Sequence, residues 1–482
     1  MSESGRKQSP RKESMIAWLD RIADTRNSWL QKNSYFHQEH ERYLKFLVSK
    51  GLRVLDMGCG TGQVLASLEP SHGVGVDFSQ RMVEIARETY PELQFELGDA
   101  EDPDLAERLG GTFDVIILSD TVGFFDDCET ALRNLQPLCT PDTRIIIAYY
   151  SKYWEPILSM AEMFGMKMRQ PPLNWLSSND IANLLHLADF DIIKRDWRQL
   201  LPRRALGLGP LVNRFIGTLP FFRRFSLRNY VVACPTPTES LGDLSATVII
   251  PCRNERGNIE PAIQRMPRFA KDMEILFVEG HSSDGTFEEC ERVRDAYAGE
   301  WDIKAVQQDG KGKGDAMRKG YDLARGDVLM ILDSDLTMPP EDLPKFYDAL
   351  VSGKGEFING SRLVYPMEQE AMRFLNWVAN QIFSLLFSWL LNQRFTDTLC
   401  GTKVLRRRHY DMIAANRSYF GDFDPFGDFD LIFGATKLNL KVVEVPIRYA
   451  SRRYGETQIS RFSHGVLLLR MVVFAFFRLK AF

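Results

Sequence analysis

Cysteine is scarce in this sequence, and its cysteines show no arrangement that suggests a cross-link or a metal. The seven cysteines include no Cys-x-x-Cys pair and no cluster with histidine at zinc-ligand spacing. Neither a disulfide framework nor a structural zinc site is therefore expected. A reducing cytosol is the compartment that fits this pattern.

An excess of charge of one sign is also missing. The 482 residues contain 60 Lys+Arg and 64 Asp+Glu, which gives a formal net charge of -4. The chain as a whole therefore lacks the charge that attracts nucleic acid, and no nucleic-acid partner is expected. With 44% hydrophobic and 26% charged residues, the composition excludes a disordered or fibrous chain. At roughly 150 residues per domain, the length alone predicts about three units.

Uninterrupted hydrophobic runs of membrane-spanning length are absent. Residues 374–391 are interrupted by two asparagines and a glutamine, and residues 466–477 are short and contain Arg470. A bilayer core needs roughly 20 predominantly apolar residues, so we expect neither to span a membrane. Residues 460–482 are typical of an amphipathic helix on a membrane surface, whereas residues 374–391 fit a surface helix and a buried helix equally well. The polar N-terminus carries no secretory signal, and we expect residues 1–28 to form a disordered or helical tail.

Short β-type runs alternate with helical segments in two series. The first series contains RVLDMG, GVGVDFS, LQFELGD, FDVIILSD and RIIIAYY, and the second contains ATVIIPCRNE, EILFVEG, DVLMILDSD and GEFINGSR. This alternation is typical of doubly wound parallel sheets. We therefore expect an α/β protein with two doubly wound domains, residues 29–233 and 247–459, joined by a proline-containing linker at residues 234–246.

A basic segment lies near the end of the first predicted domain. Between Lys194 and Arg228, nine Lys or Arg residues accompany a single acid, Asp196, and they are interleaved with LGLGPLV and FIGTLPFF. A solvated basic face is the ordinary explanation of such a run. The mixture also suits an anionic membrane surface or a phosphorylated lipid, where each basic residue contributes about 1 kcal/mol. Both interpretations stay open at this point.

Three alternating glycines follow the first predicted strand. They are Gly58, Gly60 and Gly62 in VLDMGCGTG, directly before a predicted helix. Glycine lets the backbone turn tightly and approach a ligand closely. Asp77 ends the second strand, where its carboxylate can accept hydrogen bonds from ribose hydroxyls, and Asp99-Ala100 follows the third. Because the carboxyl ends of parallel strands meet at one edge of a sheet, these loops are expected to form one crevice.

These motifs resemble those of class I S-adenosylmethionine-dependent methyltransferases over about residues 29–233. The resemblance implies a Rossmann-like domain that binds S-adenosylmethionine. The implied cofactor-binding residues are Asp56, Gly58, Gly60, Gly62, Asp77, Asp99, Ala100 and Ser119. In the family's pattern, Asp56 contacts the methionine amino group, Asp77 the ribose and Asp99 the adenine amine. A dinucleotide-binding dehydrogenase is disfavoured because the loop lacks the GxGxxG spacing.

The sequence leaves the methyl acceptor and any catalytic base open. Methyl transfer from a sulfonium releases a neutral leaving group, so a base is needed only for a protonated nucleophile. The candidates for a base are Asp120, Asp126 and Asp127, for which a solvated loop is the ordinary explanation. Asp120 is also an alternative to Ser119 for the floor of the site. Tyr35, Phe36 and His37 either fold over the ligands or belong to a helix packed on the sheet. The acceptor is an oxygen, carbon or nitrogen of a small molecule, sugar or lipid.

Several predicted strands of the second series end at charged residues. Glu279 ends its second strand, and GKGKGDAMRKG places lysines near a helix start, which suits phosphate. Asp333 and Asp335 end an apolar strand. Alternation by two aims both carboxylates to one side, where oxygen ligands suit Mg2+ or Mn2+ bridging a diphosphate. A lone Asp-x-Asp is most often structural, so the prediction depends on the combination of motifs.

Together these residues resemble family-2 glycosyltransferases of the GT-A fold, specifically the polyprenyl-phosphate branch typified by dolichyl-phosphate mannose synthase. The implied nucleotide-sugar-binding residues are Pro251, Arg253, Glu255, Glu279, Lys313, Asp333 and Arg362. The implied catalytic residues are Asp333, Asp335, Asp428, Asp430 and Arg452, with Asp333 and Asp335 as metal ligands. The usual paired acids appear as Glu279-Gly280, and Gln458 stands where a basic residue is usual. Lys313, Arg453 or Arg461 are candidates to supply that charge.

The resemblance implies inversion at the anomeric carbon by direct displacement of a nucleoside diphosphate. A lipid phosphate acceptor is already anionic, whereas a hydroxyl acceptor would need Asp428 or Asp430 as a base. We therefore expect a bifunctional enzyme of glycolipid or cell-envelope assembly, peripheral on the inner face of a membrane, with a membrane protein or a second copy as partner. It would transfer a sugar to a polyprenyl-phosphate-type lipid and methylate an unknown acceptor. The alternative is transfer to a hydroxyl, with the methyltransferase half acting as a scaffold or binding module.

Overall fold

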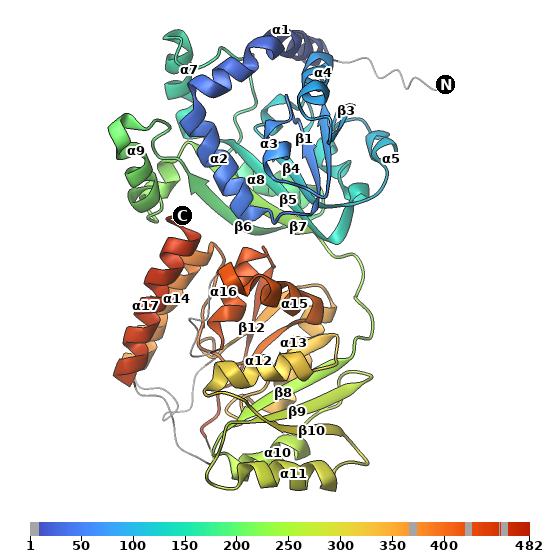
Figure 1. The fold of residues 1–482 in the computed structure, drawn as a ribbon, viewed down its shortest axis with the longest axis vertical. Helices are drawn as coiled ribbons and strands as arrows, with labels where there is room; N and C mark the ends of the chain where they lie inside the picture. The colour runs from blue at the N-terminus through green and yellow to red at the C-terminus, as the bar shows by residue number, and fades with distance from the viewer. Residues whose placement is uncertain (1–8, 366–373, 420–426, 453, 455–460) are drawn as a thin grey trace. The chain divides into compact units, whose positions relative to one another are not determined.

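The computed structural model describes residues 9–365, 374–419, 427–452, 454 and 461–482 (Figure 1). The chain divides into two compact units between Thr236 and Pro237, rather than the three that its length suggests. Each unit has its own seven-stranded sheet, built mainly of parallel strands. This confirms the predicted α/β class with two doubly wound domains. Arg453 and Gln458 lie outside the described residues, as does the side chain of Arg461.

The sheet of the first unit has the strand order β3-β2-β1-β4-β5-β7-β6. The strands are β1 (Arg53–Met57), β2 (His72–Asp77), β3 (Gln94–Leu97), β4 (Phe113–Ser119), β5 (Cys139–Tyr150), β6 (Phe190–Arg198) and β7 (Arg228–Pro235). β1 to β5 are parallel, and β7 pairs antiparallel with both β5 and β6. Leu55, Ile116 and Ile147 of the central strands are fully buried, as expected for a sheet covered on both faces.

The helices of the first unit connect these strands. They are α1 (Pro10–Lys32), α2 (Ser34–Leu47), α3 (Gln63–Ser67), α4 (Gln80–Thr89), α5 (Leu105–Leu109), α6 (Cys128–Arg133), α7 (Glu155–Met163), α8 (Ser178–Leu187) and α9 (Leu208–Leu211). The strand order reverses between β1 and β4, which places a crevice at the carboxyl ends of these strands.

α1 occupies most of the segment that we expected to be a terminal tail. Ser9 caps the helix by accepting a hydrogen bond from the Lys12 amide at 3.1 Å. Leu19 packs with Met82 of α4 in a small buried cluster. The buried Lys12 ammonium forms ion pairs with Asp99, at 2.5 Å, and with Glu101. These contacts make α1 a part of the first unit.

The sheet of the second unit has the order β10-β9-β8-β11-β13-β12-β14. The strands are β8 (Ala246–Cys252), β9 (Met273–Glu279), β10 (Asp302–Gln307), β11 (Val328–Ile331), β12 (Phe357–Ser361), β13 (Lys403–Arg406) and β14 (Val442–Pro446). β13 is antiparallel to β11 and β12, and the other pairs are parallel. The helices are α10 (Arg256–Gln264), α11 (Thr286–Ala296), α12 (Lys313–Leu323), α13 (Leu343–Val351), α14 (Phe374–Leu391), α15 (Arg407–Ala415), α16 (Phe429–Lys437) and α17 (Arg461–Leu479).

The connection between the sheets is shorter than the linker that we expected at residues 234–246. Cys234 and Pro235 pair with β6 and close β7, and Ala246 already belongs to β8. The amide of Leu241 donates to the carbonyl of Val351 at 2.8 Å, so the second half of the connection packs on the second unit. Residues 236–245 therefore join the two sheets.

α14 and α17 pack against each other in the second unit (Figure 1), where the rings of Trp389 and Phe476 lie 5.7 Å apart. Phe387 of α14 also contacts Phe429 of α16 at 5.0 Å, which attaches the pair to the unit. The outward apolar residues of the pair are Ile382, Leu385, Val466, Leu469, Val473 and Phe477. Among the described residues, no helix has the length and apolar character needed to cross a membrane. α14 thus combines a buried side with an exposed apolar side.

Replacing Lys12 by alanine is expected to loosen the start of α1, because two carboxylates lose their shared ammonium. Breaking such a buried pair costs about 3 kcal/mol. Hydrogen exchange of residues 10–24 in the full chain should accelerate accordingly. Lys50→Ala removes an exposed pair with Glu69 and is the matched control, with no change expected. Equal protection of α1 in both variants would contradict the anchoring role of Lys12.

Candidate functional site

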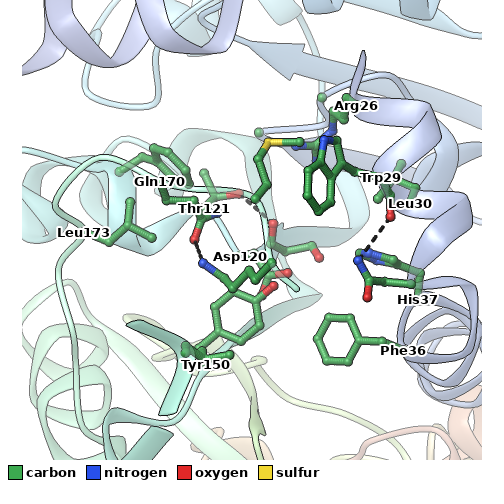
Figure 2. Close-up of a pocket in the computed structure, with 18 of the residues that line it drawn as sticks. Arg26, Trp29, Leu30, Phe36, His37, Asp120, Thr121, Tyr150, Gln170 and Leu173 are labelled. Atoms are coloured by element: carbon green, nitrogen blue, oxygen red, sulfur yellow. Dashed lines mark hydrogen bonds between the residues drawn. The ribbon is translucent and has the colours of Figure 1, made fainter. Parts of the chain in front are cut away.

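A cavity of ≈ 360 Å³ lies at the carboxyl ends of β1, β2 and β4 in the first unit. Its strand-end wall includes Gly58, Gly60, Asp77 and Ser119, which are four of the predicted cofactor-binding residues. Trp29 of α1 and Phe36 and His37 of α2 face Asp120 and Tyr150 across the cavity (Figure 2). The structure therefore brings α1, α2 and the strand ends to one concave site of the size that small ligands use.

The backbone of the glycine loop approaches its neighbours too closely for side chains. Gly58 and Gly60 have φ angles of +81° and +53°. A Cβ at Gly58 would lie 2.4 Å from the Thr121 hydroxyl, and one at Gly60 would lie 3.0 Å from the Arg26 guanidinium. The Asp77 carboxylate accepts hydrogen bonds from the amides of Gly60, at 2.8 Å, and Ser79, at 2.9 Å. The Asp77 carboxylate therefore holds in place a loop whose backbone conformation and close contacts require glycine.

Asp56 lies in β1, two residues before the loop. Its side chain is buried, and its Oδ1 has no hydrogen-bond partner among the described residues. Burial, reinforced by the Asp77 carboxylate, raises the pKa of Asp56 to about 7. A buried carboxylate oxygen without a donor suits a ligand that brings a cationic N–H group.

Four predicted cofactor residues are not part of the cavity wall, namely Asp56, Gly62, Asp99 and Ala100. Asp99 pairs with Lys12, and the carbonyl of Ala100 accepts a hydrogen bond from Asn134. Gly62, at φ +83°, packs against the Phe95 ring at the start of α3. Asp99 would bind a ligand only if its carboxylate bonded the ligand and the Lys12 ammonium together.

A chain of buried hydrogen bonds lies behind Ser119, which lines the cavity. His40 bonds Ser119 Oγ at 2.7 Å through Nε2 and the Tyr230 hydroxyl at 2.8 Å through Nδ1. Burial and the nearby Arg228 guanidinium hold the pKa of His40 well below its usual range. The same two causes lower the pKa of His37 to about 3. Both imidazoles are therefore neutral at physiological pH.

The structure separates the three aspartates proposed as a base. Asp120 lines the cavity at φ +58°, accepts a hydrogen bond from Arg228 at 2.7 Å and keeps a buried Oδ1 without a hydrogen-bond partner among the described residues. Asp126 instead pairs with Arg11, and Asp127 caps α6 through the Thr130 amide. Asp120 is therefore the one of the three that faces the cavity.

Sequence reasoning missed four residues that shape this cavity, namely Arg26, Trp29, His40 and Arg228. Arg26 and Trp29 belong to α1, which we had treated largely as a tail. Arg228 was counted only as part of a basic segment, yet it is fully buried between the rings of Phe36 and Tyr150, at 4.6 and 5.4 Å. The regular apolar spacing of α1 was the available signal for the first two.

The second unit gathers charged residues at the carboxyl ends of β8 and β11, where its strand order reverses. Lys313 pairs with Asp333 at 2.7 Å, and Arg452 bridges Glu255, at 2.9 Å, and Asp335, at 2.7 Å. The Lys313 ammonium and burial have opposite effects on Asp333, and the net result is a lowered pKa for this carboxyl. These five predicted residues therefore form one network of alternating charge.

The carboxylates of this network fit a divalent cation. They are hard oxygen donors, and a Cβ at Gly401 would lie 1.9 Å from Asp333 Oδ2, so only glycine lets this carboxylate lie there. In the part of the chain that the structure describes, no group of three Asp, Glu, His or Cys ligands includes Asp333 or Asp335. Two carboxylates suit Mg2+ or Mn2+ that takes its other ligands from phosphates and water.

The remaining predicted residues of the second unit lie at different places. Arg362 forms a two-pronged pair with Asp397, at 2.6 and 2.8 Å. Glu279 is buried and accepts hydrogen bonds from the Ser282 amide and the Gln307 side chain. Pro251 lies in β8, and the exposed Arg253 follows that strand.

The structure distinguishes the two aspartates of GDFDL. Asp428 lies 3.8 Å from the Lys313 ammonium and 3.6 Å from that of Lys403. Asp430 instead pairs with Arg417 at 2.8 Å. Asp428 therefore borders the charge network through Lys313, whereas Asp430 is held by an arginine from outside it.

The comparison with protein families matches both units. Residues 11–195 match the model of a methyltransferase domain, and residues 247–422 match glycosyl transferase family 2. The chain joins a methyltransferase domain to a family 2 glycosyltransferase domain. The cavity belongs to the methyltransferase domain and the charge network to the glycosyltransferase domain.

Curated relatives carry names of lipid-phosphate mannosyltransferases. The dolichol-phosphate mannosyltransferase of Pyrococcus furiosus is 28% identical over 45% of this chain and 59% of the relative. The Saccharomyces cerevisiae protein of the same name is 35% identical over 22% of this chain and 40% of the relative. The undecaprenyl-phosphate mannosyltransferase of Micrococcus luteus is 26% identical over 44% of this chain and 86% of the relative. The chain thus spans about half the length of the first two relatives.

Solved structures resemble each half at low identity. An S-adenosylmethionine-dependent methyltransferase from Thermotoga maritima is 18% identical, covers 46% of this chain and 100% of its own, and has a TM-score of 0.37. Glucosyl-3-phosphoglycerate synthase from Mycobacterium tuberculosis is 17% identical, covers 50% of this chain and 85% of its own, and has a TM-score of 0.37. At these scores neither superposition supports a conclusion about function.

Proposed function

We propose that the chain is a bifunctional enzyme. Its glycosyltransferase domain transfers a sugar, with inversion, from a nucleotide-sugar to a polyprenyl-phosphate-type lipid, and its methyltransferase domain transfers a methyl group from S-adenosylmethionine to a second acceptor. The observation that carries the first activity is the network of Lys313, Asp333, Asp335, Glu255 and Arg452. The names of the dolichol- and undecaprenyl-phosphate relatives support the choice of acceptor.

Departure of the nucleoside diphosphate needs positive charge beside the leaving oxygens. A divalent cation held by Asp333 and Asp335 would supply part of that charge. Lys313 and Arg452 already lie against these two carboxylates, at 2.7 Å each, and supply the rest from the protein. Glu255 orients Arg452 through its second guanidinium nitrogen.

A lipid phosphate acceptor fits both the chemistry and the surface of the glycosyltransferase domain. Its oxygen is already anionic at neutral pH, so the attack needs no strong base. The outward apolar residues of α14 and α17, including Leu385 and Phe477, suit contact with the membrane in which such a lipid resides. We therefore place the enzyme peripherally on the inner face of a membrane.

The methyltransferase cavity suits a sulfonium cofactor with a cationic amino group and a carboxylate. Asp56 offers a buried carboxylate oxygen to the amino group, and Arg26 lies over Gly60 with a positive charge for the carboxylate. Asp77 holds the loop and keeps lone pairs for ribose hydroxyls. The bound cofactor would supply an electrophilic methyl group, and the cavity walls would align the acceptor with it.

Replacing Asp335 by alanine is expected to lower sugar transfer by at least about 100-fold, because a metal ligand and the partner of Arg452 are lost together. The measurement is transfer from a nucleotide-sugar to polyprenyl phosphate, with Mg2+ or Mn2+ and with a chelator. Asp309→Ala, which removes an exposed carboxylate paired with Lys319, is the control and should retain activity. Activity that is independent of metal and unchanged in Asp335→Ala would overturn the proposed site.

The variants Asp428→Asn and Asp430→Asn test which acceptor is used. With a lipid phosphate acceptor no base is required, so we expect Asp430→Asn to retain activity and Asp428→Asn to lose less than about tenfold. A hydroxyl acceptor would make one of these carboxylates the base and cost about 100-fold or more. Both variants replace an aspartate by asparagine and so remove the same charge with the same change in side chain. Each variant therefore controls for the other. If one of these variants loses activity, and the wild type transfers sugar without any lipid, the hydroxyl acceptor is favoured.

Binding of S-adenosylmethionine is expected to strengthen as pH rises from 5.5 to 7.5. The pKa of Asp56 is raised to about 7, so below that pH the buried carboxyl must lose a proton before it can pair with the cationic amino group. The expected increase is about 25-fold over this range, and Asp56→Asn should bind more weakly with little pH dependence. Calorimetric titration of the full chain measures both. Absence of any binding by wild type would instead favour a scaffold role for this domain.

A further inference from the structure

One side of the methyltransferase domain exposes large apolar side chains on α7 and the residues beside it. Tyr153, Ile157, Met160 and Phe164 recur at helical spacing and all face solvent. Met163 is 73% exposed and Phe164 66% exposed, which is unusual for residues of this size on a soluble surface. These apolar side chains of α7 and its neighbours therefore point to solvent, and no described residue of this domain covers them.

A second apolar surface follows Pro202. Its exposed members are Leu206, Leu208, Leu211, Phe215, Ile216, Leu219, Phe221, Phe222 and Phe225. The segment is anchored from inside, because the buried Asn213 side chain bonds the amide and carbonyl of Leu201, both at 2.8 Å, and the Tyr35 hydroxyl at 2.9 Å. Its polar contacts therefore point inward and its large apolar side chains outward, the reverse of the usual arrangement of a soluble surface.

Both surfaces are continuous with the wall of the cavity. Ile157 and Met166 line the cavity and are also exposed, and Pro202 and Arg203 line it from the second surface. The Trp154 indole donates a hydrogen bond to the Phe225 carbonyl at 2.7 Å, which ties the two surfaces together. An apolar chain could lie on them while its polar end enters the cavity.

The charge on the second apolar surface, beside the cavity, is positive. Arg203, Arg204 and Arg224 are exposed, and the sequence has no acidic residue between Asp196 and Glu239. Arg203 and Arg224 form no ion pair with any residue that the structure describes. A cation beside an apolar surface favours an anionic amphipath over a neutral one, by about 1 kcal/mol for each charge.

We propose that the methyl acceptor of this domain is an anionic amphipathic lipid. Its headgroup enters the ≈ 360 Å³ cavity, and its chain lies on α7 and residues 206–225, with Arg203 and Arg224 beside its negative charge. The inference rests on the proposed methyl transfer and names its substrate class. An acceptor lone pair forms the bond to the methyl carbon as the carbon–sulfur bond breaks and its electron pair returns to sulfur. The proton of the acceptor passes to the Asp120 carboxylate and then to water.

Hydrogen exchange of the full chain with three probes tests the proposal. The probes are dodecyl phosphate, the neutral dodecyl maltoside and inorganic phosphate, the first two below their micelle concentrations. We expect dodecyl phosphate to slow exchange of residues 153–170 and 202–225 by at least about threefold, at concentrations about tenfold below those that dodecyl maltoside requires. Inorganic phosphate should protect neither segment. Equal effects of the two amphipaths, or protection by phosphate alone, would overturn the proposal.

Matched variants localise the effect. Arg203→Ala with Arg224→Ala should raise the required dodecyl phosphate concentration about tenfold, and Met160→Ser with Phe221→Ser should raise it for both amphipaths. Arg108→Ala removes an exposed arginine of α5 that is not part of the cavity wall, and Val473→Ser alters α17 of the other domain. Neither should change protection of the two segments.

If dodecyl phosphate protects neither segment while S-adenosylmethionine still binds, this inference is wrong and the proposed cofactor site stands. If protection instead follows protein concentration without any lipid, the surface joins two copies of the chain, and the proposal is wrong.

Discussion

The buried guanidinium of Arg228 joins three residues from different elements of the methyltransferase cavity wall, namely Asp120, Phe36 and Tyr150. It begins β7, pairs in the sheet with Tyr150 of β5 and Arg198 of β6, and donates to Asp120 at 2.7 Å. A fully buried cation is tolerated only when it is paired, and Asp120 and the rings of Phe36 and Tyr150 meet that need. Burial, reinforced by the same charge, lowers the pKa of both His37 and His40, so the two imidazoles stay neutral. One side chain thus contacts α2 and the turn after β4 and contributes to the protonation state of the nearby histidines.

The two catalytic domains use the same architectural solution for different ligands. In each sheet the strand order reverses once between parallel neighbours, between β1 and β4 in the first and between β8 and β11 in the second. Loops leaving such neighbours in opposite directions open a crevice. The first crevice is lined by glycines, the carboxylates of Asp77 and Asp120 and aromatic side chains, which suits a ligand that carries its own positive charge. The second is lined by carboxylates and long basic side chains, which suits a metal and a diphosphate.

Much of this organisation follows from the sequence because it depends on local pattern. Apolar runs such as VIILS and VLMIL predict the central strands, and the glycines after β1 and the aspartates after β11 predict where ligands bind. Contacts between distant residues do not leave such a pattern. Nothing around Lys12 signals Asp99 as its partner, and nothing around Asp430 signals Arg417. Arg228 is identical in sequence terms to the exposed Arg224 four residues earlier, and only the pairing of β7 with β5 buries it.

The bridge from Arg452 to Glu255 and Asp335 has a consequence for the protein before it meets any ligand. Clustered carboxylates repel one another and destabilise the loops that carry them. Here a guanidinium at 2.7 to 2.9 Å from two of them, and an ammonium beside a third, act as built-in counter-ions. These carboxylates are thereby balanced by the protein's own positive charges, so their mutual repulsion is relieved within the glycosyltransferase domain itself.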